Sequence, residues 1–415
     1  MKFTADFHIH SKYSRATSKD MDLESLDKWA KIKGIKVLGT GDFTHPEWFR
    51  ILKEKLEPAE AGLFRLKKSD SPTRFILTSE ISCIYSKKER VRKIHILIFA
   101  PSFEAVEKIN VRLGWIGNLK ADGRPILGLD AREALKIALD ASEDCLVVPC
   151  HAWTPWFSIF GSKSGFNSIE ECFDDYSKYI YAIETGLSSD PQMNWRLSAL
   201  DKITLISNSD SHSPRKIGRE ANVFDAELNY SAITNAIKNK NPEKFLYTVE
   251  FFPEEGKYHY DGHRLCGVSL PPEETKKHKN ICPKCKRPLT IGVLSRVEEL
   301  ADRPEGFRPE SAIPFRSLVP LEEIIADAFG IGVGTKQVEQ EYQKLIKSFV
   351  NEFNVLLQAI PEQLRAAALP EVAEGIISVR EGRVGVEPGY DGVYGKVKIF
   401  SKEKKEDAVS QKTLF

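Results

Sequence analysis

The chain has 415 residues, of which 41% are hydrophobic and 29% are charged, as in soluble proteins that have a sizeable core. No segment reaches the roughly 18 consecutive apolar residues of a membrane helix, and no export signal precedes the first motif, so we expect a cytoplasmic protein. The 60 Lys and Arg residues balance the 59 Asp and Glu residues, so any contact with nucleic acid requires a local basic surface.

From residue 1 to about 225, short β-branched segments alternate with longer amphipathic segments. The first strand, helix and strand of this alternation are FTADFHIH, DLESLDKWAKIKG and KVLGTGD. The pattern predicts βα units that form an α/β barrel, a fold that commonly needs roughly 250 residues. In such a barrel, the residues that follow the strands meet at one end, where barrel enzymes have their active sites.

The first predicted strand ends in Asp6-Phe7-His8-Ile9-His10. Strand side chains alternate between two faces, so His8 and His10 project to the same side and are able to bind one metal ion. Imidazole nitrogens suit Zn, Mn or Fe. The alternative is that both histidines only cap or bridge the strand end.

Ionisable residues also follow the later predicted strands. As further metal ligands we identify Asp42, Glu80, His95, His151, Asp210 and His212. Carboxylates among imidazoles suit a cluster of two or three divalent ions, which activates water for attack on phosphorus and neutralises charge on the phosphate oxygens. The sequence therefore predicts phosphoester hydrolysis, with Asp210 and His212 among the catalytic residues.

Asp190 follows another predicted strand, in the segment GLSSDP. Its carboxylate is a candidate for an additional metal ligand or a catalytic proton carrier. However, an Asp that precedes Pro191 and a helical segment is also typical of a helix N-cap. Both interpretations of Asp190 stay open at this point.

The order of these motifs resembles that of the polymerase and histidinol phosphatase (PHP) family of phosphoesterases, over roughly residues 1–225. The resemblance implies a distorted seven-stranded (β/α) barrel with two or three metal ions. The family's Thr-Asp-His motif reads Gly41-Asp42-Phe43 here, so Phe43 replaces a histidine and one metal site has fewer ligands. His45 is the candidate to compensate for this loss.

Residues 226–297 are expected to form a small zinc-binding module. His263 and Cys266 are followed, after fifteen residues, by Cys282 and Cys285, which is the spacing of a zinc ribbon with one Cys replaced by His. His278 is the competing fourth ligand. Three of the seven cysteines take part, so we expect a reducing compartment and one structural zinc ion rather than a disulfide framework. Basic and aromatic residues around this motif either follow phosphates and stack on bases or form a solvated surface.

Residues 298–400 are expected to be mostly helical, with KQVEQEYQKLIKSFVNEFNVLLQAI as a packing helix because its apolar residues recur at helical spacing. Residues 401–415 are expected to be a flexible, charged tail. Its end resembles the Gln-x-x-Leu-Phe peptides that bind DNA sliding clamps, with Gln411, Leu414 and Phe415 at the matching positions. A terminus without such a role is the alternative.

Together with the segments HAWTPWFSIF, ETGLSSDP and VEELADRP, the barrel motifs and the zinc module resemble the endonuclease Q family over roughly residues 1–330. This resemblance implies a metal-dependent DNA-repair endonuclease that cuts on the 5′ side of uracil, hypoxanthine, xanthine or an abasic site, with Zn, Mn or Mg at the barrel site. Such a lesion has to be turned out of the base stack into a pocket near the metals. The candidates to contact the DNA are Tyr13, Ser18, Lys19, Trp153 and Trp156.

Two other functions compete with this interpretation. A small-molecule phosphatase would use the same barrel, but it leaves the zinc module and the tail unexplained. A DNA-binding accessory protein with a purely structural barrel does not require a nearly full set of metal ligands.

Overall fold

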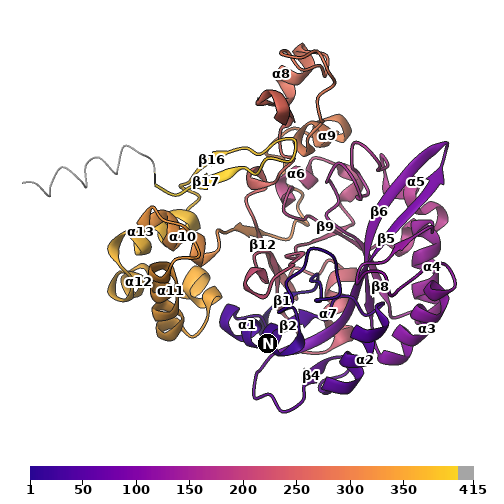
Figure 1. Cartoon of the computed structure of the whole chain (residues 1–415), viewed down its shortest axis with the longest axis horizontal. Coiled ribbons are helices and arrows are strands. Elements are labelled where there is room, and N and C mark those ends of the chain that lie inside the picture. The colour runs from indigo at the N-terminus through magenta and orange to yellow at the C-terminus, as the bar shows by residue number, and fades with distance from the viewer. Residues whose placement is uncertain (401–415) are drawn as a thin grey trace, which may run out of the picture.

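One large mixed sheet organises the computed structural model, which describes residues 1–400 (Figure 1). Its eleven strands are β1 (Lys2–Asp6), β2 (Val37–Gly39), β3 (Leu56–Pro58), β4 (Phe64–Leu66), β5 (Arg74–Lys87), β6 (Arg90–Ala100), β7 (Ile126–Leu127), β8 (Leu146–Pro149), β11 (Ala221–Asp225), β12 (Phe245–Glu250) and β15 (Phe315–Ser317). β1 lies in the middle of the sheet, between the parallel β2 and the antiparallel β11. The chain therefore has the mixed α/β fold that the sequence predicts.

Seven α-helices belong to residues 1–240 of the chain. They are α1 (Leu23–Lys33), α2 (Pro46–Lys55), α3 (Phe103–Gly114), α4 (Ala131–Ala141), α5 (Ile169–Phe173), α6 (Pro191–Trp195) and α7 (Tyr230–Lys238). In α4, Asp130 caps the N-terminus by accepting a hydrogen bond from the Arg132 N–H. Ala134, Leu135 and Ala138 form one buried face of α4, as expected of an amphipathic helix. This helix packs against β6 and β8.

β5 and β6 depart from the predicted alternation of strand and helix. They are antiparallel and pair as far as Lys87 and Arg90, whereas β2 and β5 are parallel. The turn between them consists of Lys88 and Glu89, with φ of 52° and 59°, which is typical of a type I′ hairpin turn. Asn-Gly or Asp-Gly usually marks such a turn in a sequence, so Lys-Glu carries no hairpin signal.

A second, two-stranded sheet consists of the parallel strands β9 (Ala182–Glu184) and β10 (Thr204–Ile206). β9 contacts β8, but within residues 1–400 no strand pairing joins the two sheets. The strand pairings establish the mixed α/β class, and the closed seven-stranded barrel stays a prediction.

The large sheet continues beyond residue 225, the predicted end of the barrel unit, because β12 pairs with β11 and β15 pairs with β12. Two further two-stranded antiparallel sheets consist of β13 (Asp261–His263) with β14 (Val268–Leu270) and of β16 (Gly385–Glu387) with β17 (Lys396–Lys398). The helices of this part are α8 (Pro272–Lys277), α9 (Val293–Leu300), α10 (Leu321–Phe329), α11 (Lys336–Phe349), α12 (Pro361–Ala367) and α13 (Pro370–Arg380). α8 projects from the top of the molecule, and α10 to α13 gather at the left (Figure 1). The predicted domain boundaries stay predictions.

The predicted packing helix is shorter than its sequence pattern. α11 ends at Phe349, before Val350, whose φ of 76° is incompatible with a helix. A π-helical turn follows over Asn354–Gln358. Tyr342 and Leu345 are buried, as expected of a packing helix.

Three further expectations concern membrane helices, the cysteines and the C-terminal tail. Among residues 1–400, no helix has both the length and the apolar character needed to cross a membrane. All seven cysteines lie in the described part of the chain, and all have free thiols. The predicted clamp-binding end, with Gln411, Leu414 and Phe415, lies outside the described residues.

Candidate metal centre

Four of the predicted metal ligands meet at one point of the structure. Ligand atoms of His8, His10, Glu80 and Asp210 all lie within 4.8 Å of one another, and we call this group site A. Glu80 Oε2 lies 3.5 Å from His8 Nε2 and 3.2 Å from His10 Nε2. Asp210 Oδ1 lies 3.6 Å and 3.0 Å from the same two nitrogen atoms. Residues that are far apart in the sequence therefore form one candidate metal site.

A second group adjoins the first. Ligand atoms of Glu80, His95 and His151 also lie within 4.8 Å of one another, and we call this group site B. Glu80 Oε1 lies 2.6 Å from His95 Nδ1 and 3.3 Å from His151 Nε2. Glu80 thus presents one carboxylate oxygen to each site. A carboxylate shared between two cations is the arrangement expected of a two-metal centre.

The strand positions of two ligands differ from the prediction. Glu80 and His95 lie inside β5 and β6 rather than at strand ends. Glu80 pairs with Leu97, and side chains two residues apart on a strand share a face. Glu80 and His95 therefore point to the same side of the hairpin, whose middle supplies both ligands.

Two carboxylates contact the Nδ1 atoms of the two histidines of site A. Glu184 Oε1 lies 3.0 Å from His8 Nδ1, and Asp42 Oδ1 lies 3.0 Å from His10 Nδ1. A carboxylate at one ring nitrogen fixes the orientation of the ring and leaves the other nitrogen for a metal ion. Asp42 was predicted as a ligand, but its contact with His10 Nδ1 gives it an orienting position, and within the described residues it belongs to neither site.

Glu184 is a residue of the metal centre that the sequence analysis missed. Its carboxylate also accepts hydrogen bonds from the His151 N–H at 2.8 Å and from the Asn208 side chain at 3.0 Å. Its position at the end of β9 was the available signal. Arg124, whose Nη1 lies 3.0 Å from Glu80 Oε2, follows no strand and carried no comparable signal.

Site A contains a buried nitrogen that the protein leaves without a hydrogen bond. Within residues 1–400, His8 Nε2 is buried and has no hydrogen-bond partner. Buried polar atoms without a partner are rare, and a bound cation would provide one. Imidazole and carboxylate donors together suit divalent ions such as Zn or Mn. The residues of the two sites therefore fit divalent metal ions.

His8 of site A and His95 of site B have pKa values shifted in opposite directions. Burial alone would lower the pKa of His8, but the carboxylates of Glu184, Glu80 and Asp210 raise it well above its ordinary value. At His95, burial lowers the pKa to about 4 despite the neighbouring Glu80, so its imidazole is neutral at pH 7. Metal binding at site A must therefore displace protons, and its metal affinity is expected to rise with pH.

Three residues of the metal centre have a left-handed backbone. Asp42, His151 and Asp210 have φ of 49°, 28° and 47°. Such conformations cost residues with a Cβ atom on the order of 1–3 kcal/mol each, and they concentrate at functional sites. The surrounding structure must therefore hold these residues in place.

Asp190 and His45 are helix N-caps in the structure. Asp190 Oδ1 accepts a hydrogen bond from the Met193 N–H at 2.9 Å, and His45 Nδ1 accepts one from the Trp48 N–H at 3.4 Å. Burial raises the pKa of Asp190 to about 6. Within the described residues, neither belongs to site A or site B. The N-cap interpretation accounts for Asp190, and its catalytic role stays a prediction.

His212 lies beside site A. Its ring centre is 4.6 Å from that of His10, and its Nδ1 lies 2.8 Å from the carbonyl oxygen of Asp210. A third of its side chain (33%) is exposed. A partly exposed imidazole in this position is able to exchange protons with a substrate. Its roles as ligand and catalyst stay predictions.

Glu250 is a buried carboxyl group that predicts a pH effect on stability. Hydroxyl groups of Thr185 and Ser207 donate hydrogen bonds to its Oε2 at 2.9 and 3.1 Å. Burial raises its pKa from 4.5 to about 8 in the folded protein. Between these values the unfolded chain ionises first, so the stability present below pH 4.5 is lost as the pH rises to 8.

We expect Glu250→Gln to flatten this decline, because the amide does not titrate. We compare the unfolding free energy of the variant with that of the parent protein at each pH. This difference should favour the variant by up to about 4 kcal/mol more at pH 8 than at pH 5. Urea unfolding at both pH values measures this gain, with the exposed Glu243→Gln as control. Parallel pH profiles for Glu250→Gln and the parent protein would contradict the prediction.

An open cleft adjoins the metal centre. Its wall includes His95, His151 and Asp210, so the cleft reaches both sites. The remaining wall includes Lys257 and Tyr258, which precede the zinc motif in the chain. The cleft has about 1350 Å³ of empty space, including the space open to solvent, which is sufficient for a nucleotide.

Trp156 lines this cleft, whereas Trp153 does not. Trp156 is 37% exposed, and its ring contacts that of Tyr258 edge-on, with ring centres 5.7 Å apart. Trp153 is only 1% exposed, and its Nε1 donates a hydrogen bond to Asn194 Oδ1 at 2.8 Å. The structure therefore places Trp153 in the core, where it is not accessible to DNA, and corrects its predicted role.

Tyr13, Ser18 and Lys19 lie on the segment after His10 and do not line the cleft. Tyr13 stacks on His45, with ring centres 4.4 Å apart. The Ser18 N–H donates a hydrogen bond to the carbonyl oxygen of His212 at 2.8 Å, and Lys19 is exposed. Contacts of these three residues with DNA stay predictions.

The zinc motif forms a third group of candidate ligands. Ligand atoms of His263, Cys266, Cys282 and Cys285 lie within 4.8 Å of one another, and Cys285 Sγ lies 3.7 Å from His263 Nδ1. His278 lies at the C-terminal end of α8, outside this group. The geometry favours His263 as the fourth ligand and fits a zinc-ribbon-like module.

The chain is similar over nearly its full length to solved endonuclease structures. The lesion-specific endonuclease PfuEndoQ from Pyrococcus furiosus matches with a TM-score of 0.86 and 32% identity, covering 99% of each chain. A structure of endonuclease Q in complex with a 27-mer duplex substrate that has an abasic lesion at the active site matches with a TM-score of 0.85 and 31% identity. That match covers 97% of this chain and 98% of the other.

The chain also matches a family model and a protein from another organism. A family model for the MJ0043 C-terminal domain matches residues 320–383. The protein MJ0043 of Methanocaldococcus jannaschii is 34% identical over 307 residues, which are 70% of this chain and 37% of that protein. The match thus spans little more than a third of MJ0043.

Proposed function

The chain belongs to the endonuclease Q family, and on this premise we propose that it is a metal-dependent DNA-repair endonuclease. The observation that carries the chemistry is Glu80, whose two carboxylate oxygens belong to two adjacent groups of candidate metal ligands. Two cations bridged by a carboxylate form a centre suited to phosphodiester hydrolysis. The strands around this centre are proposed to form a distorted seven-stranded barrel of the PHP type.

The proposed substrate is duplex DNA with an abasic site or a deaminated base, cut on the 5′ side of the lesion. The endonuclease Q complex with an abasic lesion at its active site supports this choice. In the present chain, Trp156 and Tyr258 offer aromatic surfaces in the cleft to a nucleotide that is turned out of the stack. Lys257 and Arg219, which line the same cleft, offer positive charge to the DNA backbone.

The chain's own side chains prepare the centre for this reaction. Bound divalent cations, with Mn, Mg and Zn as candidates, would activate water and neutralise charge on the phosphate oxygens. Glu184 and Asp42 hold the two histidines of site A in position for metal binding. Arg124, 3.0 Å from Glu80 Oε2, compensates the negative charge of the shared carboxylate.

Cellular context completes the proposal. The seven free cysteines favour a reducing cytoplasm, and the His263 group is proposed to hold one structural zinc ion. A sliding clamp as partner stays a prediction, because Gln411, Leu414 and Phe415 lie outside the described residues.

A nicking assay tests the proposed function. Purified protein with Mg²⁺ or Mn²⁺ should nick a duplex that contains one deoxyuridine, deoxyinosine or abasic site and leave the matched duplex intact. His8→Ala removes a ligand of site A, so it should reduce nicking by more than the roughly 10- to 100-fold typical of residues that only support a ligand. Denaturing gels with an end-labelled strand measure the rate and map the cut.

His278→Ala is the matched control, because His278 belongs to neither site A nor site B and lies outside the His263 group. It should nick like the parent protein. Equal cutting of damaged and matched duplexes contradicts lesion specificity. Hydrolysis of phosphomonoesters without any nicking favours the small-molecule phosphatase.

A further inference from the structure

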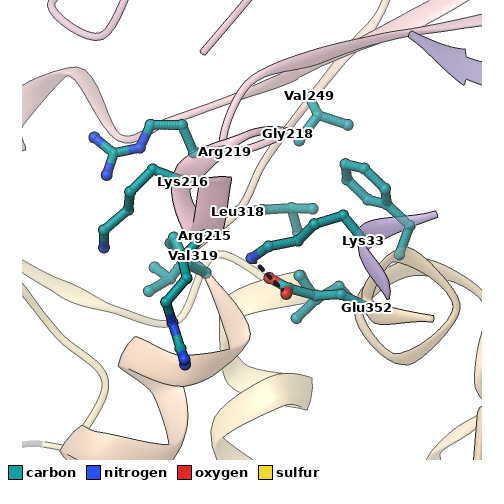
Figure 2. Close-up of a pocket in the computed structure, with 12 residues that line it drawn as sticks. Lys33, Arg215, Lys216, Gly218, Arg219, Val249, Leu318, Val319 and Glu352 are labelled. Carbon is teal, nitrogen blue, oxygen red and sulfur yellow. Dashed lines mark ion pairs between the residues drawn. The ribbon is translucent and has the colours of Figure 1, made fainter. Parts of the chain in front are cut away.

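The segment that carries Asp210 is tied to the C-terminal helices by ion pairs. Arg215, on the short helical turn Pro214–Lys216, places Nη2 2.9 Å from Glu322 Oε2 and 2.9 Å from Glu339 Oε2. Lys216 Nζ lies 2.8 Å from Glu323 Oε1. Figure 2 shows Arg215 and Lys216 where the segment after Asp210 meets the C-terminal helices, and we call this contact region the seam.

This seam is more than an exposed surface contact. The Glu322 side chain is 4% exposed, and the Arg215 guanidinium lies over the Trp29 ring, 4.9 Å from its centre. Next to them, Lys33 Nζ lies 2.6 Å from Glu352 Oε2, and both side chains are 6% exposed (Figure 2). An isolated surface ion pair contributes little, but a partly buried network fixes the geometry of its members.

The same segment is also held on its inner side. Asp6 Oδ1 accepts a hydrogen bond from the Ser209 N–H at 3.1 Å, and Asp6 Oδ2 accepts one from the Gly218 N–H at 2.8 Å. Between these anchors, Asp210 has a φ of 47°, which a residue with a Cβ atom adopts only when its surroundings enforce it. The position of Asp210 therefore depends on contacts outside site A.

We infer that the helical unit α10–α13 positions Asp210 for metal binding, and that Arg215 is the positioning residue through which it acts. Asp210 Oδ1 lies 3.0 Å from His10 Nε2, and metal coordination tolerates deviations of only a few tenths of an ångström, on the order of 0.2 Å. A small rotation of the turn Pro214–Lys216 is therefore enough to weaken binding at site A. The inference rests on the proposed function and assigns a role to the region that matches the MJ0043 C-terminal domain.

Calorimetric titration of the metal-free, full-length protein with MnCl₂ tests this inference. Arg215→Gln should weaken Mn²⁺ binding several-fold, on the order of 3- to 10-fold, which is less than the 10- to 100-fold typical of residues in direct contact with a ligand. The nicking rate of Arg215→Gln at saturating Mn²⁺ should approach that of the parent protein. Arg215→Lys keeps the charge but not the two-sided contact, so it should recover part of the affinity.

Arg132→Gln is the matched control. Arg132 also pairs with two acids, Glu133 and Asp175, and its guanidinium lies 4.8 Å from the centre of the Tyr176 ring. It belongs to α4, and neither of its two partners belongs to a candidate metal site. The Arg132→Gln variant should keep the Mn²⁺ affinity of the parent protein, whatever its effect on the melting temperature.

The two glutamates of the C-terminal helices that pair with Arg215 provide a second, independent variant. Glu322→Gln combined with Glu339→Gln should weaken Mn²⁺ binding about as much as Arg215→Gln, and adding Arg215→Gln should cause little further loss. Unchanged affinity in both variants overturns the inference, and so does an equal loss in Arg132→Gln. If the parent protein binds Mn²⁺ but does not nick damaged DNA, the proposed function fails, and the affinity comparison still decides the role of Arg215.

Discussion

Replacing Glu80 by glutamine is expected to abolish metal binding at both sites and to reduce nicking of damaged DNA by roughly three orders of magnitude. The amide is uncharged and would not neutralise cations held at the two sites, whereas Glu80 presents Oε2 to site A and Oε1 to site B. Lewis-acid stabilisation lowers the free energy of the transition state by several kcal/mol. A change of about 1.4 kcal/mol in the activation free energy changes a rate tenfold. Metal analysis of the purified protein and single-turnover nicking kinetics measure both losses.

Glu60→Gln is the control for the loss of a carboxylate that pairs with arginine. Glu60 Oε2 lies 2.6 Å from Arg74 Nε, much as Glu80 pairs with Arg124, but it belongs to neither metal site. Thermal unfolding of both variants separates loss of stability from loss of metal. A Glu80→Gln protein that keeps two metal ions and full activity would disprove the bridging role.

The sequence identified candidate ligands that meet in the fold, but it did not predict the geometry in which they meet. His8, His10 and Asp210 follow buried strands, where an ionisable side chain has few structural reasons to occur, and they meet in site A. The same signal marked Asp42, which belongs to this centre but contacts His10 Nδ1 instead of the position available to a metal ion. A sequence pattern predicts which residues lie close together. Which of their atoms face a metal ion depends on side-chain contacts between distant parts of the fold.

The two tryptophans of HAWTPWFSIF show the same limit. Trp153 and Trp156 lie three residues apart, and neither composition nor spacing distinguishes them. Trp153 is buried, and its Nε1 donates a hydrogen bond to Asn194 of α6, while Trp156 lies on the cleft beside Tyr258. Both partners come from distant parts of the chain, so burial could not be predicted from the local segment.

For the fold, the α/β class followed from the alternating pattern, but the β5–β6 hairpin did not. Its turn, Lys88-Glu89, lacks the usual turn residues, and residues 75–83 and 94–100 of the two strands are buried on both faces. The contacts of Arg215 with the C-terminal helices were equally unpredictable, because a charged residue in a sequence carries no information about its partner.

The Cys282→Ala variant is expected to lose the zinc ion completely and to unfold the segment around the His263 group. Structural zinc contributes about 10–16 kcal/mol in zinc-finger peptides near pH 7, which is more than a module of this size gains from its small core. That core consists of Val268, Cys282 and Leu289 with few neighbours. Zinc analysis and limited proteolysis measure the loss, with new cleavage sites expected between Tyr258 and Leu289.

Nicking of damaged DNA should also fall in this variant, because the zinc module supports one wall of the cleft. The Arg264 N–H donates a hydrogen bond to Asp391 Oδ2 at 2.7 Å, and Lys257 Nζ lies 4.4 Å from the centre of the Tyr394 ring. Lys257 and Tyr394 both line the cleft, so unfolding of the module should disorder this wall and weaken DNA binding more than it slows the cut at saturating DNA.

Two controls make the zinc prediction specific. Cys83→Ala removes another fully buried thiol, which lies in β5 outside the group, so it should keep the zinc ion. His278→Ala should keep it as well, whereas His263→Ala should lose it, because only His263 lies within reach of the three cysteines. Retention of zinc by His263→Ala together with its loss from His278→Ala would reverse the ligand assignment, since the tetrahedral site needs one histidine beside the three thiolates.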